Sequence, residues 1–198
     1  MKSLLTLLFI IMVHISILNS QIAEKAEDIK PILTGATLPN AELKDQNGMV
    51  VHLNDILLNK QTVLVFYRGS WCPFCNQHLS ALATSQEEII KLGYQIIAIS
   101  PDDYQNLNPM IKVDKLNYKL YSDPDGKLIR QIGLAFKESE QTKIYIASKT
   151  TGATTQVLPV PALMVVNGKS EIVFEYINPD FKHRITQKLL LAILNNLN

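Results

Sequence analysis

The stretch VLVFYRGSWCPFC, residues 63–75, decides the fold and contains both cysteines of the chain. Its first five residues are β-branched, aliphatic or aromatic, and a run so short and apolar is typical of a strand covered on both faces. Residues 68–70 form a turn, and apolar residues then recur at a helical period across residues 73–91. Gly93 follows, a residue favoured just after a helix end. The stretch therefore predicts a buried central strand that leads into a helix.

Further strands and helices are expected on the C-terminal side of this unit. Residues 95–99 form a second buried strand candidate, and a helix is expected near residues 104–115. A strand, helix, strand order implies a parallel pair of strands joined by a crossover. Residues 118–121 predict a short strand and residues 127–132 a short helix. Leucines and isoleucine at helical spacing across residues 189–197 predict a terminal amphipathic helix.

Two hairpins flank this core in the sequence. Residues 41–44 and 50–53 surround an Asn-Gly pair, the dipeptide most typical of a tight hairpin turn. Residues 162–166 and 171–176 surround a second Asn-Gly pair. Residues 137–157 are polar and rich in Lys, Thr and Ser, and a run this long predicts an insertion over one edge of the domain. The whole pattern predicts a single α/β domain.

The first twenty residues have the composition of an export signal. A lysine precedes an apolar run of about fifteen residues, which is shorter than the roughly twenty that a spanning helix needs. We expect residues 1–20 to be a signal peptide cleaved after Ser20, with an uncleaved anchor as the alternative. Residues 21–34 are then a lead-in segment and residues 35–198 the domain. The mature chain is expected to be periplasmic or secreted, without stable membrane insertion.

The charge of the chain argues against nucleic acid as a partner. Nineteen Lys and Arg against eighteen Asp and Glu leave a net charge of +1, and 47% of the residues are hydrophobic. A neutral chain has no basic surface with which to bind phosphate backbones. No Gly-rich phosphate-binding loop and no spacing typical of zinc ligands is present. We therefore expect neither a cofactor nor a metal.

The cysteine pair carries the chemistry. Cys72 and Cys75 lie between the central strand and the helix, where unpaired N–H groups and the helix dipole favour a thiolate. A partner thiol three residues away can close a disulfide ring that stores two electrons. A structural disulfide would restrain little of the unfolded chain, half a zinc site lacks its other ligands, and an inert pair does not fit this turn. The pair is interpreted as a redox centre.

The motif resembles the active site of the thioredoxin fold. WCPFC at residues 71–75 follows an apolar strand, as the cysteine pair does in that fold. Residues 160–162, Val-Pro-Ala, resemble the cis-proline loop that lies against the pair. The resemblance implies a thioredoxin-like mixed central sheet with helices on both faces, and it makes Pro161 a candidate cis proline.

A wider resemblance is to the AhpC/TSA family, the peroxiredoxin-like proteins. It rests on residues 65–75, 99–102, 120–126 and 158–162 and spans residues 35–197. It implies a thiol peroxidase that reduces hydrogen peroxide or organic hydroperoxides and is reduced again by an external dithiol, such as a thioredoxin-like protein.

Alignment with that family assigns roles to the two cysteines. Cys75 falls at the position of the attacking, peroxidatic cysteine, and Cys72 at the position of a threonine. Arg68 stands at the position of the active-site proline, and no arginine near residues 154–166 matches the one that supports the peroxide. If Cys72 attacks instead, the protein is a thiol:disulfide oxidoreductase that acts on protein disulfides. A third reading is a non-catalytic, redox-sensing binding module.

Three residues are expected to support the pair. Pro161 would lie against the cysteines, Trp71 would shield them and offer a docking surface, and Arg68 would favour a thiolate or hold an oxyanion. His78 lies three residues after Cys75 on the same helix face. It is interpreted as a partly exposed side chain in preference to a proton relay.

Overall fold

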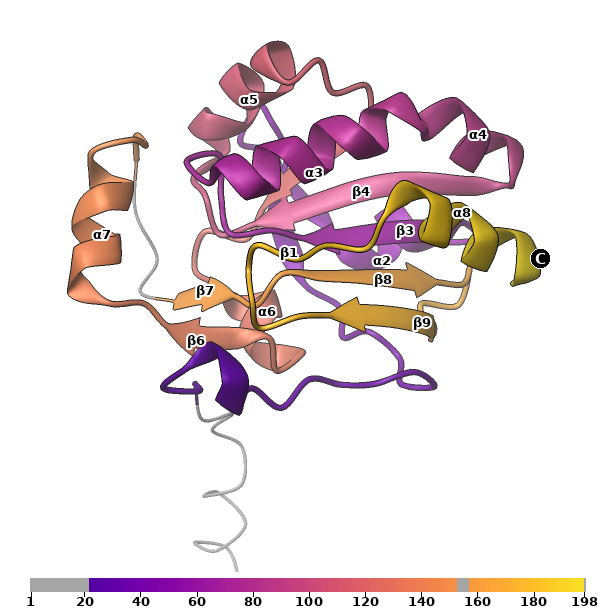
Figure 1. Cartoon of the computed structure of the whole chain (residues 1–198), viewed down its shortest axis with the longest axis horizontal. Helices are drawn as coiled ribbons and strands as arrows, with labels where there is room; N and C mark the ends of the chain where they lie inside the picture. Colours follow the sequence, from indigo (N-terminus) through magenta and orange to yellow (C-terminus); the bar gives the residue numbers. More distant parts are fainter. Residues whose placement is uncertain (1–21, 153–156, 198) are drawn as a thin grey trace, which may run out of the picture.

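The fold is built on one mixed sheet of seven strands (Figure 1). The structure is a computed structural model that describes residues 22–152 and 157–197, so the predicted export signal lies outside the described residues. The strand order is β2-β1-β5-β4-β3-β8-β9. The strands are β1 (Glu42–Lys44), β2 (Val50–His52), β3 (Gln61–Phe66), β4 (Tyr94–Ser100), β5 (Lys119–Ser122), β8 (Ala162–Val166) and β9 (Ile172–Ile177). Both predicted hairpins are confirmed, because β1 pairs with β2, and β8 with β9, in antiparallel fashion.

The central strand β3 is buried on both faces, as its composition predicts. It pairs with β4 in parallel and with β8 in antiparallel fashion. Alternate side chains enter different hydrophobic clusters, with Val63 and Val65 on one face and Leu64 and Phe66 on the other. Each such side chain contributes about 1.5–3 kcal/mol when fully buried. An uninterrupted apolar run is therefore the pattern that a doubly covered strand requires.

Helices cover the two faces of the sheet, which confirms the predicted fold class. On one face lie α3 (Pro73–Thr84), α4 (Gln86–Lys91), α5 (Leu107–Val113) and α8 (Gln187–Asn196), and on the other lie α2 (Leu53–Leu57) and α6 (Lys127–Gln131). Short 3-10 helices are η1 (Ala26–Asp28) and η2 (Tyr104–Asn106). The helix expected across residues 73–91 is interrupted at Ser85. Its N–H donates to the carbonyl of Leu82, three residues back, whereas a continuous α-helix bonds to the fourth residue back.

The polar segment at residues 137–157 is helical in part, within the residues up to 152 that the structure describes. It contains α7 (Glu140–Ala147), which begins where the Ser139 side chain accepts a hydrogen bond from the Thr142 N–H. Strands β6 (Ala135–Lys137) and β7 (Val157–Pro159) flank it as a separate antiparallel pair. Figure 1 shows α7 standing beside the main sheet at the left of the molecule. Its polar composition fits a helix that packs few of its residues into the core.

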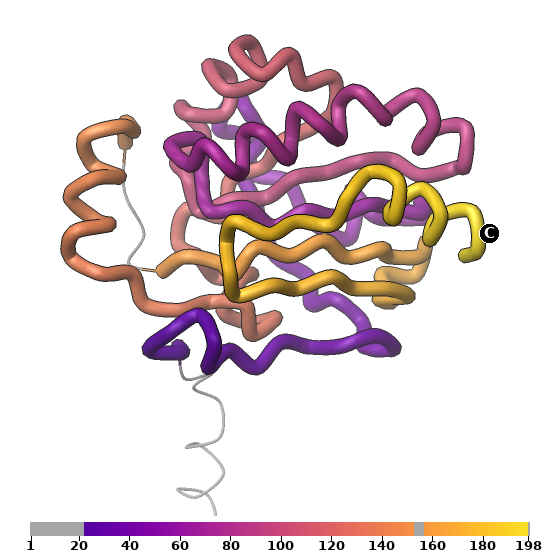
Figure 2. Tube along the Cα trace, viewed as in Figure 1, coloured from indigo at the N-terminus to yellow at the C-terminus, as the bar shows by residue number. Residues whose placement is uncertain are grey.

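The described part of the lead-in segment packs on the domain. The Ala23 N–H donates to the Ala135 carbonyl at 3.3 Å, and the Lys137 N–H donates to the Ala23 carbonyl at 2.9 Å. Further along, the Gly35 N–H donates to the Ile172 carbonyl at 2.8 Å. In Figure 2 the indigo trace runs along the edge of the domain below β9. Within residues 22–152 and 157–197, no helix has both the length and the apolar character needed to cross a membrane.

Candidate active site

The two cysteines lie at the start of α3, as predicted. Cys72 is the N-cap residue, with extended backbone angles of φ −94° and ψ 108°, and Pro73 takes the first helical position. The Cys72 carbonyl accepts hydrogen bonds from the Cys75 N–H at 3.0 Å and from the Asn76 N–H at 3.1 Å. Both cysteines are thiols, and each is only 1% exposed. The end of β3 and the first turn of α3 thus hold the two sulfurs together.

The two thiols have opposite pKa shifts. The pKa of Cys72 is lowered to about 6, chiefly because the Cys75 side chain hydrogen-bonds to its sulfur, with help from the positive charges of Arg68 and Arg184. Burial raises the pKa of Cys75 well above its ordinary value, and the neighbouring Cys72 raises it further. Of the two thiols, Cys72 is therefore the one that ionises more readily, with Cys75 as its hydrogen-bond donor.

The two cysteines also differ in their position relative to a cleft. Cys72 lines a cleft of about 330 Å³ together with Arg68, Trp71 and Phe181, whereas Cys75 is not among its lining residues. The thiolate and the open side of the site therefore coincide at Cys72. This geometry favours Cys72 as the attacking sulfur, the reverse of the order that alignment with the peroxiredoxins implies.

Arg68 is held between two aromatic rings. Its guanidinium lies 4.7 Å from the Trp71 ring centroid and 4.3 Å from the Phe181 ring centroid. Its charge helps to lower the pKa of Cys72, and its backbone hydrogen bond favours the Cys75 thiolate. The structure therefore brings Arg68 and Trp71 to the cysteine pair. Phe181, from the segment between β9 and α8, was not predicted.

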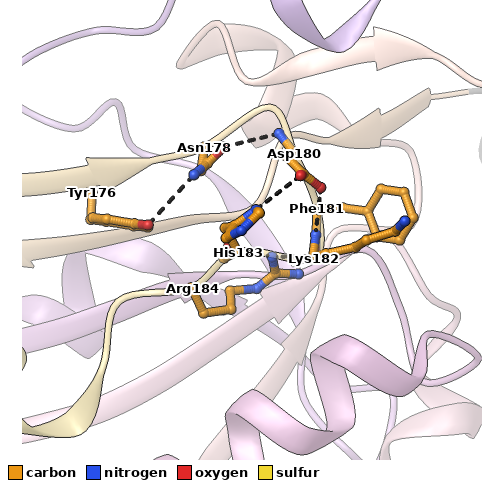
Figure 3. A network of polar contacts seen from close by, with 7 residues as sticks. All are labelled: Tyr176, Asn178, Asp180, Phe181, Lys182, His183 and Arg184. Atoms are coloured by element: carbon orange, nitrogen blue, oxygen red, sulfur yellow. Dashed lines mark hydrogen bonds and ion pairs between the residues drawn. The ribbon is translucent and has the colours of Figure 1, made fainter.

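Arg184 is the charged group that the sequence analysis missed. Its Nη2 lies 3.7 Å from the Cys75 sulfur, and its Nη1 donates hydrogen bonds to the Phe181 and His183 carbonyls. Figure 3 shows it in the network that follows β9, with Phe181 close by. Arg184 ends the sequence Lys-His-Arg and is 109 residues from Cys75. Such a basic cluster looks like ordinary surface charge, so no signal in the sequence singled it out.

His78 is buried, so the expectation of a partly exposed side chain is wrong. It is 9% exposed, and its Nε2 has no hydrogen-bond partner among the described residues. Burial and the charge of Arg184 lower the pKa of His78 to about 4. The ring is therefore neutral at pH 7 and lines a small cavity beside Arg184 and Pro161.

The peptide bond between Val160 and Pro161 is trans, so the predicted cis proline is also wrong. Pro161 lies between β7 and β8, and the chain passes from one sheet to the other in extended form. The Val160 N–H donates to the Leu134 carbonyl at 2.9 Å, and the Pro161 carbonyl accepts from the Asn178 N–H at 3.4 Å. A trans bond keeps this path extended, whereas a cis bond would turn it.

Asp102 holds the loop that precedes the cysteines. This carboxylate is 6% exposed and accepts a hydrogen bond from the Ser70 N–H at 2.6 Å. The approach is so close that a Cβ on Gly69 would stand 2.5 Å from Asp102 Oδ1, which explains the glycine. Burial raises the pKa of Asp102 from 3.8 to about 6. At neutral pH the protein therefore keeps a desolvated negative charge beneath its active-site loop.

Asp102→Asn is expected to stabilise the protein at pH 7.5 by roughly 3 kcal/mol, because the amide still accepts from Ser70 and carries no charge. A raised folded-state pKa makes the wild type lose stability as the pH rises from about 4 to above 6. The variant should therefore match the wild type near pH 3 and exceed it at pH 7.5 in urea unfolding. Asp103→Asn is the neighbouring control, and an equal gain there would contradict this explanation.

The arrangement of the sheet, the helix and the two thiols is typical of one class of protein. A thioredoxin-like sheet whose first long helix starts on two neighbouring thiols has the arrangement that dithiol redox chemistry requires. In the part of the chain that the structure describes, no three His, Cys, Asp or Glu side chains are grouped to hold a metal ion. The Cys75 peptide N–H and the positive charges of Arg68 and Arg184 help to lower the pKa of Cys72.

Comparison with known proteins gives the family. The model of the AhpC/TSA family matches residues 34–175, and the chain belongs to that family. Peroxiredoxin Bcp of Escherichia coli K12 is 30% identical over 155 residues, which cover 78% of this chain and 90% of that protein. The 1-Cys peroxiredoxin PER1 of Hordeum vulgare is 28% identical over 123 residues, which cover 59% of this chain and 56% of that protein.

Solved structures share the fold at low sequence identity. Reduced Prx3 of Vibrio vulnificus in complex with H2O2 superposes with a TM-score of 0.70 at 16% identity, covering 82% of this chain and 99% of that one. Peroxidoxin BcpB of Mycobacterium tuberculosis superposes with a TM-score of 0.65 at 20% identity, covering 84% and 99%. These likenesses confirm the thioredoxin-like peroxiredoxin fold.

Proposed function

We propose that the protein is a thiol peroxidase that reduces hydrogen peroxide or an organic hydroperoxide through Cys72 and Cys75. The observation that carries the proposal is a Cys72 thiolate, with a pKa of about 6, that faces a cleft and touches a second thiol. Membership of the AhpC/TSA family supports the same chemistry, as does the similarity to proteins named peroxiredoxins.

The first step joins sulfur to oxygen. The Cys72 thiolate attacks one peroxide oxygen, the O–O bond breaks, and Cys72 becomes a sulfenic acid. The departing alkoxide or hydroxide takes a proton from the Cys75 thiol and leaves as alcohol or water. Arg184, 3.7 Å from the Cys75 sulfur, and the Arg68 backbone favour the new Cys75 thiolate.

The second step forms the disulfide. The Cys75 thiolate attacks the Cys72 sulfur, the S–OH bond breaks, and the hydroxide takes a proton from solvent to leave as water. Two electrons have then passed from the thiols to one peroxide. An external dithiol returns the pair to its reduced form by thiol-disulfide exchange, which begins with attack on the Cys72 sulfur from the cleft.

The position of Cys72 at the cleft also favours a second candidate function. A thiolate at a cleft, with a second thiol beside it, can attack a protein disulfide, and the protein would then be a thiol:disulfide oxidoreductase. The same two cysteines serve both reactions, so the substrate distinguishes them.

The test is consumption of peroxide by the purified protein with dithiothreitol or a thioredoxin system as reductant. We expect catalytic turnover, and without reductant the loss of two thiols and 2 Da per peroxide consumed. Reduction of insulin disulfides without any peroxide consumption would establish the oxidoreductase instead. Failure of both reactions would leave a non-catalytic redox-sensing module.

The proposal includes export. Residues 1–20 have the pattern of a signal peptide, and an exported dithiol protein works where disulfides persist. The external reductant must then reach that compartment. The test is to express the full chain in a host that exports proteins and to sequence the N-terminus of the purified product. Gln21 should be the first residue if cleavage follows Ser20.

A further inference from the structure

We propose that the cleft in front of Cys72 binds the apolar body of a bulky aromatic hydroperoxide, with Tyr145 of α7 as its specificity-determining residue. The inference rests on the proposed peroxidase function and adds the substrate class. It makes α7 and the residue before it, Ser139, a part of the substrate site.

Four aromatic side chains from three separate segments line the cleft, together with the polar side chains of Ser139, Gln141 and Thr142 on the α7 side. Trp71 and Phe74 come from the start of α3, Tyr145 from α7 and Phe181 from the segment after β9. The rings meet edge to face, with centroids 6.0 Å apart for Trp71 and Tyr145 and 5.7 Å apart for Phe74 and Phe181. Tyr145 is 45% exposed and Phe74 is 39% exposed. Ring surface beside the thiolate therefore remains open to a ligand.

The size of the cleft exceeds what the smallest peroxide needs. Its volume is about 330 Å³, within the range of about 300–1,000 Å³ typical of small-molecule sites. A water molecule occupies about 30 Å³ of liquid, so hydrogen peroxide fills only a small part and cannot touch opposing walls at once. A substituted benzene ring can, since aromatic pairs pack at centroid distances of about 4.5–7 Å.

The polar groups of the cleft set the orientation of such a ligand. Cys72 and Arg68 both line the cleft, the charge of Arg68 acts on the Cys72 sulfur, and Arg68 is itself fixed between Trp71 and Phe181. The positive charge complements the alkoxide that develops as the O–O bond breaks. The hydroperoxide group therefore belongs beside Cys72 and Arg68, with the uncharged ring toward Tyr145.

The first experiment compares two peroxides. We expect Tyr145→Ala to lower the ratio of kcat/KM for cumene hydroperoxide to kcat/KM for hydrogen peroxide about tenfold, because only the aromatic substrate reaches that ring. Ile144→Ala is the matched control, since Ile144 is the preceding residue of α7, is 72% exposed and does not line the cleft. An unchanged ratio in Tyr145→Ala, or an equal fall in Ile144→Ala, would overturn the inference.

The second experiment needs no turnover. Trp71 is the single tryptophan of the chain and lies in the cleft wall, so its fluorescence reports on occupancy. In the Cys72→Ser/Cys75→Ser variant we expect a saturable change on titration with 2-phenyl-2-propanol, the alcohol product of cumene hydroperoxide, and none with tert-butanol. Adding Tyr145→Ala should weaken the apparent affinity about tenfold. Absence of saturable binding would overturn the inference, whereas binding without peroxide turnover would overturn only the proposed function.

Discussion

Cys72→Ser is expected to lower peroxide turnover by about 1,000-fold or more, because the hydroxyl that replaces the thiolate is not ionised at neutral pH. The remaining Cys75 does not line the cleft, and burial holds its pKa well above the ordinary value. The variant should therefore form no sulfenic acid with dilute peroxide and should react slowly with iodoacetamide at pH 7. Peroxide assays and mass spectrometry of the trapped adduct measure both effects.

The wild-type protein provides the reference for this prediction. Its alkylation rate should rise with pH around a midpoint near 6, the pKa to which hydrogen bonding by Cys75 lowers Cys72. A Cys72→Ser protein that retains this midpoint and becomes oxidised at Cys75 would contradict the assignment. The order of attack would then be the one that alignment with the peroxiredoxins implies, with Cys75 first.

Cys75→Ser is expected to stop the reaction after one equivalent of peroxide, with steady-state turnover reduced by about 100-fold or more. The Cys72 sulfenic acid still forms, but no second sulfur is present to displace the hydroxide. Mass spectrometry should find one added oxygen on Cys72, or a mixed disulfide when a small thiol is supplied. Unchanged steady-state turnover would show that an external thiol resolves the sulfenic acid directly.

Cys75→Ala separates the two tasks of Cys75. A serine hydroxyl can still donate a hydrogen bond to the Cys72 thiolate, but alanine cannot. The alkylation midpoint should therefore stay closer to 6 in Cys75→Ser and move further toward 9.0, the ordinary value, in Cys75→Ala. At pH 7 a pKa of 6 leaves about 90% thiolate and a pKa of 9 about 1%, so the first oxidation should slow by up to about 90-fold. Equal midpoints in the two variants would contradict the hydrogen bond as the main cause.

The features that could be predicted from sequence are those that depend on neighbours along the chain. The apolar run of β3, followed by a turn and a helix with Pro73 at its first position, specifies where Cys72 lies. Asn-Gly turns specify the hairpins, because the required backbone angles are local. The interruption at Ser85 escaped prediction, since apolar spacing alone does not reveal a hydrogen bond to the third residue back in place of the fourth.

The residues that sequence reasoning missed act over long separations. Arg184 and Phe181 reach the cysteines only because β9 returns the chain to the same end of the sheet, and Tyr145 only because β6 and β7 carry α7 there. The position of His78 along its helix suggested partial exposure, yet its side chain lines a small cavity with Arg184 and Pro161. None of these contacts leaves a local pattern.

The sequence by itself determined the α/β class, the redox pair at the start of a helix and the family resemblance, because secondary structure and helix-end electrostatics arise within a few residues. Only the tertiary structure decided which sulfur meets the cleft, which arginines stand near the pair and what lines the approach. Burial and charge at a sulfur depend on every segment packed around it, and those segments come from distant parts of the chain.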